Sequence, residues 1–361
     1  MEYRIACTKC RHIEKENAFR CSRCNSILEV KIDYSSVRLG KKFTKEKPSG
    51  LKYLPFFPIN KFHVKGGEGG TEMVRKMVGP NEILLKIETK NPTMSFKDRG
   101  SAVEINKAKE LKAQSVVCAS TGNMGISVAR YAKLAKIGAT IFISKNADRK
   151  KMALIKKHGA ALVEVNGDFN ASCRMAEKFA QRTGAFMCGD YHLRKEGQKS
   201  LMFEVIDQLR YNVPDFVFVS VGNATLLAAM YKALLEYKKF KLIRKFPKLV
   251  AVQSDKCDPL VNAYNSGKRI EYMKPRTMAD AIAVGYPTFG LEGIIALKKT
   301  SGIALKVSED QINDAVLMLS GMGIGAETGG AAAFAGYMKL YEENRGALSK
   351  KRTVIVISGN N

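Results

Sequence analysis

The sequence predicts an α/β fold preceded by a small cysteine-rich module. Short apolar runs typical of buried strands alternate along the chain with segments in which apolar residues recur at helical spacing. The strand-like runs cover residues 83–87, 115–118, 139–143, 161–165, 216–221, 249–253, 304–307 and 353–358, and helical spacing is clear at 127–136, 171–181 and 224–236. Strand–helix–strand order repeated in this way favours largely parallel sheets with helices on both faces.

Length and composition exclude several protein classes. The chain has 361 residues, 45% hydrophobic and 26% charged, so it can bury a sizeable core and is neither a fibre nor a disordered tail. Its longest apolar runs, 215–221 and 353–358, are far shorter than the roughly 20 residues of a membrane span. Residues 1–30 carry charges throughout, unlike the apolar core of a secretory signal. We therefore expect a cytoplasmic protein without a transmembrane helix.

The chain is strongly basic. Sixty Lys and Arg residues against 34 Asp and Glu give a formal net charge of +26, which attracts nucleic acid, anionic membranes and anionic metabolites alike. The charge is densest at 145–157 and 232–248, where basic residues do not alternate with stacking aromatics as in single-strand-binding platforms. Solvated helix faces are the ordinary interpretation. Binding of nucleic acid remains a weaker alternative.

Two close cysteine pairs lie near the N-terminus. Cys7 and Cys10 form the first Cys-x-x-Cys pair, and Cys21 and Cys24 form the second after ten intervening residues. Such pairs can place four thiolates tetrahedrally around Zn²⁺ in a closed, structural site. Redox dithiols or disulfides are the alternative, which a cytosolic location disfavours. We predict a zinc ribbon over residues 1–34.

Three strand-to-helix junctions have unusual sequences, and ligands gather at such junctions in α/β sheets. At 116–125 a strand leads to Ser120 and Thr121, and at 216–227 a strand leads to another polar turn; both suit an anion at a helix start. In the third, at 91–100, Lys97 opens a helix. Lys97 is either a solvated first-turn lysine beside Asp98 or an amine whose pKa is lowered enough to form a Schiff base.

The lysine junction resembles a known family. Asn91-Pro-Thr-Met-Ser-Phe-Lys-Asp-Arg-Gly100 is similar to the lysine segment of fold type II pyridoxal-phosphate enzymes, and most of all to that of threonine synthases, which usually have Gly in place of Met94. Further resemblances follow in the family's order along nearly the whole chain. They are Gly67-Glu-Gly-Gly-Thr71, Ser120-Thr-Gly-Asn123, Glu196-Gly-Gln-Lys199, Ala281-Ile-Ala-Val-Gly-Tyr-Pro287 and Ser358-Gly359, and some threonine synthases also carry a cysteine ribbon.

The resemblance implies a role for each matching residue. Lys97 would hold pyridoxal 5'-phosphate as a Schiff base and then move protons at the substrate's carbon atoms. Phe96 would pack near the cofactor ring, and Asn123 would hydrogen-bond its phenolic oxygen. Ser358 would face the pyridine nitrogen, where a hydroxyl in place of a carboxylate favours elimination over transamination.

The resemblance also implies which residues hold the anionic groups. Ser120 and Thr121 would bind the substrate carboxylate, and Arg194 would clamp a substrate phosphate, since its fork suits a dianion. The loop around the cofactor phosphate would consist of Gly222, Asn223, Ala224, Thr225 and Leu226.

The implied architecture has three parts. The zinc ribbon covers 1–34, a small α/β domain with the Schiff-base lysine covers 91–189, and a large phosphate-binding α/β domain covers 35–90 and 190–361, with the cofactor in the cleft between the two α/β domains. The implied activity is that of threonine synthase, which eliminates phosphate from O-phospho-L-homoserine and adds water at the β carbon to give L-threonine. A homodimer is also implied.

Two departures from the family pattern keep other functions open. Thr225 and Leu226 replace Gly and Asn in the phosphate loop, and Cys188-Gly-Asp-Tyr-His192 stands where the family usually has Asn-Ser-x-Asn-Pro for the substrate phosphate. The alternatives are a cysteate synthase-like enzyme that acts on phosphoserine or a serine/threonine dehydratase. A weaker alternative is a nucleic-acid-binding protein that combines the ribbon and the basic surface with a degenerate enzyme fold.

Overall fold

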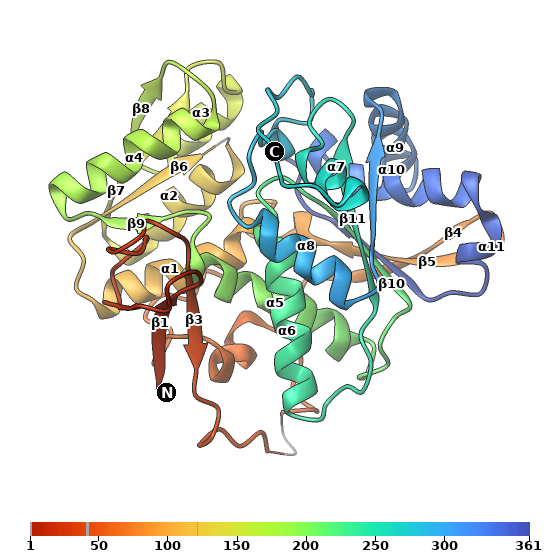
Figure 1. The fold of residues 1–361 in the computed structure, drawn as a ribbon, viewed down its shortest axis with the longest axis horizontal. Coiled ribbons are helices and arrows are strands. Elements are labelled where there is room, and N and C mark those ends of the chain that lie inside the picture. The colour runs from red at the N-terminus through yellow and green to blue at the C-terminus, as the bar shows by residue number, and fades with distance from the viewer. Residues whose placement is uncertain (1, 41–42, 121) are drawn as a thin grey trace. The chain divides into compact units, whose positions relative to one another are not determined.

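A computed structural model describes residues 2–40, 43–120 and 122–361 (Figure 1). The chain divides into two compact units, each formed by two stretches of sequence. The first unit consists of Met1–Gly70 and Lys97–Ser200, and the second of Thr71–Phe96 and Leu201–Asn361. Among the described residues, no helix is both long and apolar enough to cross a membrane.

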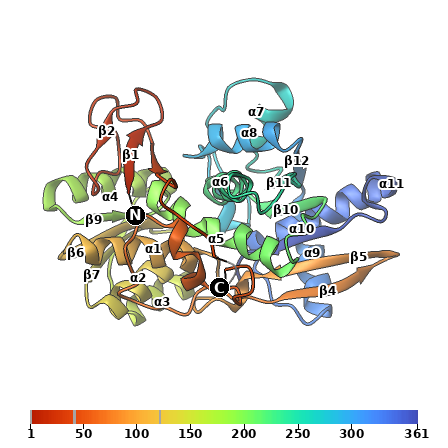
Figure 2. The same cartoon turned by 90° about the horizontal axis from the view of Figure 1, so that it is seen from below.

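The first unit begins with the cysteine module. Strand β1 (Tyr3–Cys7) pairs antiparallel with β2 (Ile13–Glu14) on one edge (Figure 2) and with β3 (Leu28–Ile32) on the other (Figure 1). Its buried core is small and consists of Ile5, Cys7, Cys21 and Leu28. Two of these four residues are candidate metal ligands, so this module has little apolar surface with which to fold by itself.

The rest of the first unit is a four-stranded parallel sheet in the order β8-β7-β6-β9. The strands are β6 (Ser115–Ser120), β7 (Gly138–Ser144), β8 (Ala161–Val165) and β9 (Phe186–Cys188). Its helices are α1 (Lys97–Glu110), α2 (Asn123–Ala135), α3 (Arg149–Lys157) and α4 (Phe169–Thr183), with a 3-10 helix at Gly50–Phe56. Helix α5 (His192–Gln208) begins in this unit and ends in the second.

The second unit contains a six-stranded sheet in the order β12-β11-β10-β13-β5-β4. The strands are β4 (Met73–Val78), β5 (Asn81–Ile87), β10 (Phe216–Ser220), β11 (Lys248–Ser254), β12 (Ile303–Val307) and β13 (Thr353–Ile357). Its helices are α6 (Thr225–Lys239), α7 (Pro259–Ser266), α8 (Gly290–Lys299), α9 (Glu309–Gly321), α10 (Thr328–Glu343) and α11 (Arg345–Leu348). All neighbouring strands are parallel except the β4–β5 hairpin.

The predicted α/β fold class is confirmed, and each of the eight predicted runs forms a strand. The central strands are detectable because a parallel strand covered on both faces is apolar throughout, as in Phe216–Ser220 and Thr353–Ile357, where every residue is buried. Strand β4 was not predicted because it is an edge strand with a partly exposed, mixed sequence, and β9 was missed because it has only three residues.

The two units begin and end at other residues than the predicted domains. Residues 35–70 belong to the first unit, whereas the prediction placed them in the large domain. Hydrogen bonds tie this stretch to α1, because Val64 N donates to Asn106 Oδ1 at 2.8 Å and Asn60 N donates to Glu110 Oε1 at 2.6 Å. Residues 91–96, predicted in the small domain, belong to the second unit, and residues 190–200, predicted in the large domain, belong to the first.

Candidate active site

The lysine segment is a tight turn fastened to the end of strand β13. Met94 N donates to Asn91 O at 2.8 Å, and Met94 has a φ of 53°. This left-handed conformation explains why a glycine suits the position. Phe96 N donates to Ser358 O at 3.1 Å, and Asn360 N donates to Met94 O at 3.0 Å. The backbone directly before Lys97 is therefore fixed by the residues that follow strand β13.

Lys97 is the first residue of α1 and is partly buried. Burial lowers the pKa of its amine, and the positive charge of Arg194 adds to this, while the carboxylate of Asp190 acts in the opposite direction. A lowered pKa leaves more of the amine unprotonated, which is the form that attacks a carbonyl carbon. The adjacent Asp98 is fully buried and accepts a hydrogen bond from Ser127 Oγ at 2.6 Å. The alternative of a solvated lysine beside a solvated Asp98 is therefore not what the structure has.

Arg194 has a different environment from the one predicted. Its side chain is 0% exposed and forms an ion pair with Glu104, which is 1% exposed. Nη1 also donates to Lys97 O at 3.1 Å and Nη2 to Ser101 Oγ at 3.1 Å. The guanidinium therefore holds the first turn of α1 and has no exposed surface in this structure, which argues against the predicted phosphate clamp.

The Ser120-Thr-Gly-Asn123 motif lies where β6 ends and α2 begins. Ser120 Oγ accepts hydrogen bonds from Gly122 N at 2.8 Å and from Gly125 N at 2.7 Å, so its hydroxyl shapes the loop and retains one proton to donate. Asn123 is buried and is the first residue of α2. Thr121, the other predicted carboxylate ligand, lies outside the described residues.

Sequence reasoning missed one lysine beside this loop. Lys151 lies in the first turn of α3 and is only 2% exposed. A Cβ atom on Gly122, whose φ is 141°, would lie 2.3 Å from Lys151 Cδ, so the lysine stem packs directly on the loop. From the sequence, the basic stretch 145–157, which contains Lys151, is interpreted as a solvated helix face. The available signal was helical spacing, which puts Lys151 on the same face as the buried Ile155, four residues later.

The second unit carries the predicted phosphate loop, between β10 and α6. Ala224 has a φ of 59°, and the helix begins at Thr225, which is buried. The side chain of Asn223 is already engaged, because its Oδ1 accepts a hydrogen bond from Thr288 N at 2.7 Å. A phosphate at this loop could be bound by the backbone N–H groups at the start of α6, whatever side chain follows. This explains how Leu226, which has no polar side-chain atom, is tolerated here.

Ser358 directly follows β13, which lies between β10 and β5 in the sheet. Its side chain is buried, and its carbonyl oxygen holds Phe96 as described above. A hydroxyl at this position carries no charge, so it can hydrogen-bond a ring nitrogen without holding a proton on it.

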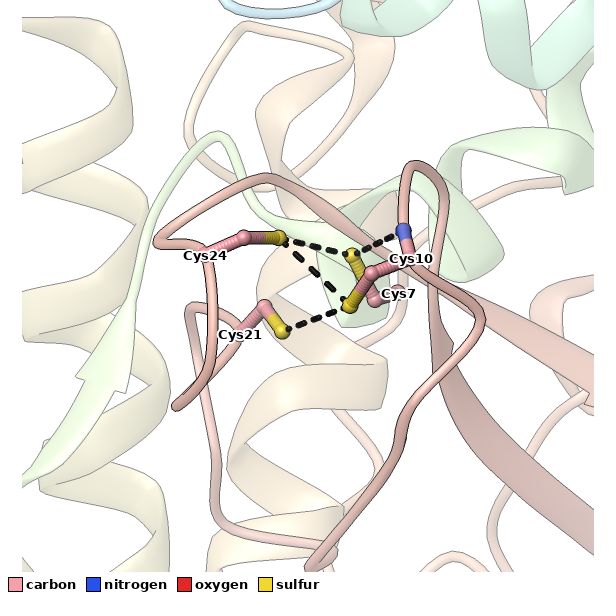
Figure 3. Close-up of side chains that lie close together, drawn as sticks. All are labelled: Cys7, Cys10, Cys21 and Cys24. Atoms are coloured by element: carbon pink, nitrogen blue, oxygen red, sulfur yellow. Dashed lines mark hydrogen bonds between the residues drawn. The ribbon is translucent and has the colours of Figure 1, made fainter.

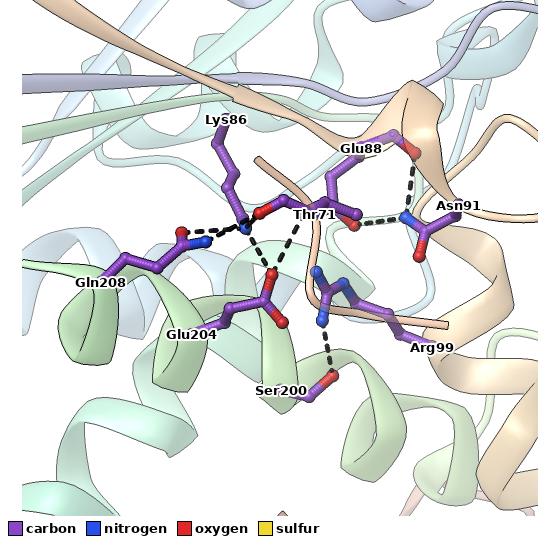
Figure 4. Close-up of polar contacts among 8 residues, drawn as sticks. All are labelled: Thr71, Lys86, Glu88, Asn91, Arg99, Ser200, Glu204 and Gln208. Carbon is purple, nitrogen blue, oxygen red and sulfur yellow. Dashed lines mark hydrogen bonds and ion pairs between the residues drawn. The ribbon is translucent and has the colours of Figure 1, made fainter. Parts of the chain in front are cut away.

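A buried polar network supports the start of the lysine segment (Figure 4). Thr71 Oγ1 donates to Glu88 Oε1 at 2.7 Å, and Asn91 Nδ2 donates to Glu88 Oε2 at 2.9 Å. Lys86 Nζ donates to Thr71 O at 2.6 Å and forms an ion pair with Glu204. The Gly67–Thr71 motif thus ends in a residue that helps to hold the turn carrying Asn91. None of these partners was predicted from the sequence.

Figure 4 also shows a contact within the first unit. Arg99, two residues after Lys97, is buried, and its Nη1 donates to Ser200 Oγ at 3.2 Å. This bond joins the first turn of α1 to α5, as the contacts of Arg194 do.

The four N-terminal cysteines converge (Figure 3). Their sulfur atoms all lie within 4.8 Å of one another, with Cys7 Sγ 3.4 Å from Cys24 Sγ and Cys10 Sγ 3.5 Å from Cys21 Sγ. Four sulfurs at about 2.3 Å from a tetrahedral Zn²⁺ lie about 3.8 Å apart. Cys10 N donates to Cys7 Sγ at 3.3 Å. The donor set therefore fits a closed metal site, as predicted.

Comparisons with known proteins show what the chain as a whole is similar to. Residues 64–359 match a family described as "Pyridoxal-phosphate dependent enzyme". The chain is 32% identical to threonine synthase of Methanosarcina acetivorans, over 99% of this chain and 91% of the relative. It is also 32% identical to threonine synthase of Methanocaldococcus jannaschii, over 98% and 90%.

Two solved structures share the fold at lower identity. Maize serine racemase has a TM-score of 0.70 at 22% identity, covering 81% of this chain and 88% of that one. An L-serine ammonia-lyase from Rhizomucor miehei has a TM-score of 0.71 at 20% identity, covering 81% and 93%.

Proposed function

The chain belongs to the pyridoxal-phosphate-dependent enzymes of fold type II, and we propose that it is a threonine synthase that converts O-phospho-L-homoserine and water to L-threonine and phosphate. The observation that carries this proposal is Lys97, an amine of lowered pKa at the first position of α1. The similarity to threonine synthases over nearly the full chain, cysteine module included, supports the choice of substrate.

The predicted cofactor residues are of types that suit pyridoxal phosphate. Lys97 would hold it covalently, with Asn123 as a hydrogen-bond partner, and the backbone at the start of α6 would bind its phosphate. Ser358 would be the partner of its ring nitrogen. When bound, pyridoxal phosphate supplies an electron sink for negative charge at the substrate's α carbon.

The chain's own residues would perform the other steps. The amine of Lys97 would move protons at the α, β and γ carbons of the substrate while phosphate leaves the γ carbon and water adds at the β carbon. Its lowered pKa suits this work, because the amine must accept a proton and return it near neutral pH. Ser120 would donate its remaining proton to the substrate carboxylate. Lys151 is positioned beside the same loop and would add positive charge there.

A second candidate is a dehydratase that acts on L-threonine or L-serine. It is favoured by the buried ion pair of Arg194 with Glu104, which removes the expected clamp for a substrate phosphate. A dehydratase needs no second phosphate site. A phosphoserine-using β-replacement enzyme shares the requirement for such a site and is therefore less favoured by this observation.

We propose that the four cysteines bind one structural Zn²⁺ per chain. Four thiolates leave no open coordination position, so the metal would stabilise the module without taking part in the reaction.

The proposed function is tested with the pyridoxal-phosphate-loaded protein. Phosphate release and threonine formation are measured on O-phospho-L-homoserine, with O-phospho-L-serine, L-serine and L-threonine in parallel. Lys97→Ala is the inactive control, and Lys90→Ala, at an exposed lysine of the preceding turn, is the matched control.

Phosphate and threonine from the homoserine ester, lost in Lys97→Ala only, is the expected result. Ammonia and a 2-oxo acid from L-threonine or L-serine, without phosphate release from either ester, would replace the proposal with the dehydratase. Absence of a Lys97-dependent absorbance band after addition of pyridoxal phosphate would contradict both candidates.

A further inference from the structure

The loop between the two cysteine pairs packs on Tyr191, within the segment that departs from the family pattern. The rings of Phe19 and Tyr191 meet edge to face, with centroids 5.7 Å apart and an interplanar angle of 68°. The guanidinium carbon of Arg20 lies 5.5 Å from the centroid of the same ring. Both geometries are attractive for an aromatic ring. Two consecutive residues next to the metal ligand Cys21 therefore contact one buried tyrosine.

Glu177 of α4 completes this contact. Its Oε1 accepts from Arg20 Nε at 3.0 Å and from the Tyr191 hydroxyl at 2.8 Å. The Arg20–Glu177 ion pair is largely shielded from water, with side chains 25% and 19% exposed. The Tyr191 ring is thus held by the module at its face and edge and by α4 at its hydroxyl.

Tyr191 in turn belongs to a tight turn at the start of α5. Tyr191 N donates to Gly189 O at 2.6 Å, and Gly189 N donates to Glu104 Oε1 at 2.8 Å. Glu104 is also the ion-pair partner of Arg194, which holds Lys97 O. The same turn contains Asp190, a buried carboxylate whose charge acts on Lys97. A shift of Tyr191 would therefore move groups that surround the lysine.

We propose that Phe19 and Arg20 are positioning residues that set the Gly189–Tyr191 turn, so that the cysteine module controls the affinity for substrate. This inference rests on the proposed function for the identity of the substrate. In the family pattern, polar residues of this stretch hold the substrate phosphate, whereas here the stretch carries a tyrosine that the module contacts. The alternative is that the contact only attaches the module to the first unit.

The test compares a double variant, Phe19→Ala with Arg20→Ala, with Arg23→Ala as the matched control. Arg23 is an exposed arginine of the same module and lies between Cys21 and Cys24 in the sequence, two residues after Cys21. All proteins are studied as full chains loaded with pyridoxal phosphate and Zn²⁺. Hydrogen exchange is measured at residues 186–195, and KM and kcat are measured with O-phospho-L-homoserine.

For the double variant we expect exchange at residues 188–192 to be at least about tenfold faster and KM to rise about fivefold or more, with kcat changed less than about twofold. Arg23→Ala is expected to match the unmodified protein. The conservative pair Phe19→Tyr with Arg20→Lys keeps an aromatic edge and a cation, so it is expected to recover most of the affinity.

Two results would overturn the inference. Unchanged exchange at 188–192 would show that the module does not hold the turn, and faster exchange with unchanged KM would show that the contact is an attachment only. Failure of the proposed function is a separate result, recognised by the unmodified protein releasing no phosphate. In that case two readouts replace KM: hydrogen exchange at residues 188–192 and the absorbance spectrum of the Lys97-bound cofactor. The inference then stands only if the double variant alters both.

Discussion

Arg194 and Glu104 form an ion pair from which water is excluded, and this pair fixes the helix that begins with Lys97. Glu104 and Lys97 both belong to α1, and Arg194 belongs to α5, so the pair joins the two helices. Arg194 contributes a further bond to Lys97 O, and Glu104 contributes one to Gly189 N. An arginine that the family resemblance assigns to substrate therefore has protein partners at both terminal nitrogens, Nη1 and Nη2.

Replacing Glu104 with Gln is expected to lower the free energy of unfolding by about 3 kcal/mol, because it leaves the buried charge of Arg194 without its counter-charge. Urea unfolding followed by circular dichroism measures the change. Glu82→Gln removes the carboxylate of an exposed pair with Arg75 and should cost less than about 1 kcal/mol. Equal losses in the two variants would show that the Arg194–Glu104 pair contributes no more than a surface pair.

Gly197→Ala is expected to destabilise the protein, although alanine is the better helix former by about 1 kcal/mol. Gly197 lies in α5, and a Cβ atom there would be 2.1 Å from Arg99 O and 2.9 Å from Gly100 Cα. Because these atoms are backbone of α1, no side-chain rotation can relieve the overlap. Thermal unfolding measures the effect. Gly321→Ala, at the open end of α9, should be neutral or slightly stabilising, and the same sign for both substitutions would contradict the close approach of α1 and α5.

Much of the fold and part of the site follow from local sequence. The buried strands β10 and β13 are apolar throughout, and the spacing of Cys7, Cys10, Cys21 and Cys24 predicts their convergence. Lys97 is recognisable because its surrounding motif is contiguous. In each case the signal lies within a few residues of the chain or in a repeated spacing.

The rest depends on partners that are distant in sequence. Glu104 is 90 residues from Arg194, and nothing near Arg194 indicates that a carboxylate will neutralise it. The packing of Phe19 on Tyr191 likewise joins the cysteine module to a helix start far along the chain. Such pairs are fixed by packing of whole elements, which a single sequence does not specify locally.

The stability of the cofactor-free protein should depend on Lys97 in a pH-dependent way. Burial lowers the pKa of Lys97 below its ordinary value of 10.5, so between the lowered value and 10.5 the unfolded chain binds a proton that the folded chain does not. The free energy of unfolding is therefore not reduced by Lys97 above pH 10.5. It falls progressively as the pH falls from 10.5 to the lowered pKa, and the loss is complete below that pKa.

It follows that Lys97→Met should stabilise the cofactor-free protein near neutral pH and that this advantage should shrink as the pH approaches 10.5. Urea unfolding of both proteins at several pH values measures the difference. Lys90→Met, at an exposed lysine, controls for loss of a positive charge. An advantage that stays constant across this range would contradict the lowered pKa.

Removal of the metal is expected to unfold the cysteine module while both α/β sheets stay folded. The hydrophobic cluster at the centre of the module is small, with Ile5, Leu28 and the candidate ligands Cys7 and Cys21 as its buried members, so we expect the metal to be needed to stabilise these 34 residues. We expect one zinc per chain by elemental analysis and, after chelation, loss of hydrogen-exchange protection in β1 and β3 but not in β6 and β7. Cys21→Ser should have the same effect, and Cys173→Ser, at a cysteine outside the cluster, should not. Protection of β1 that persists without metal would mean that contacts such as Lys107 Nζ to Tyr3 Oη, 2.7 Å long, suffice to hold the module.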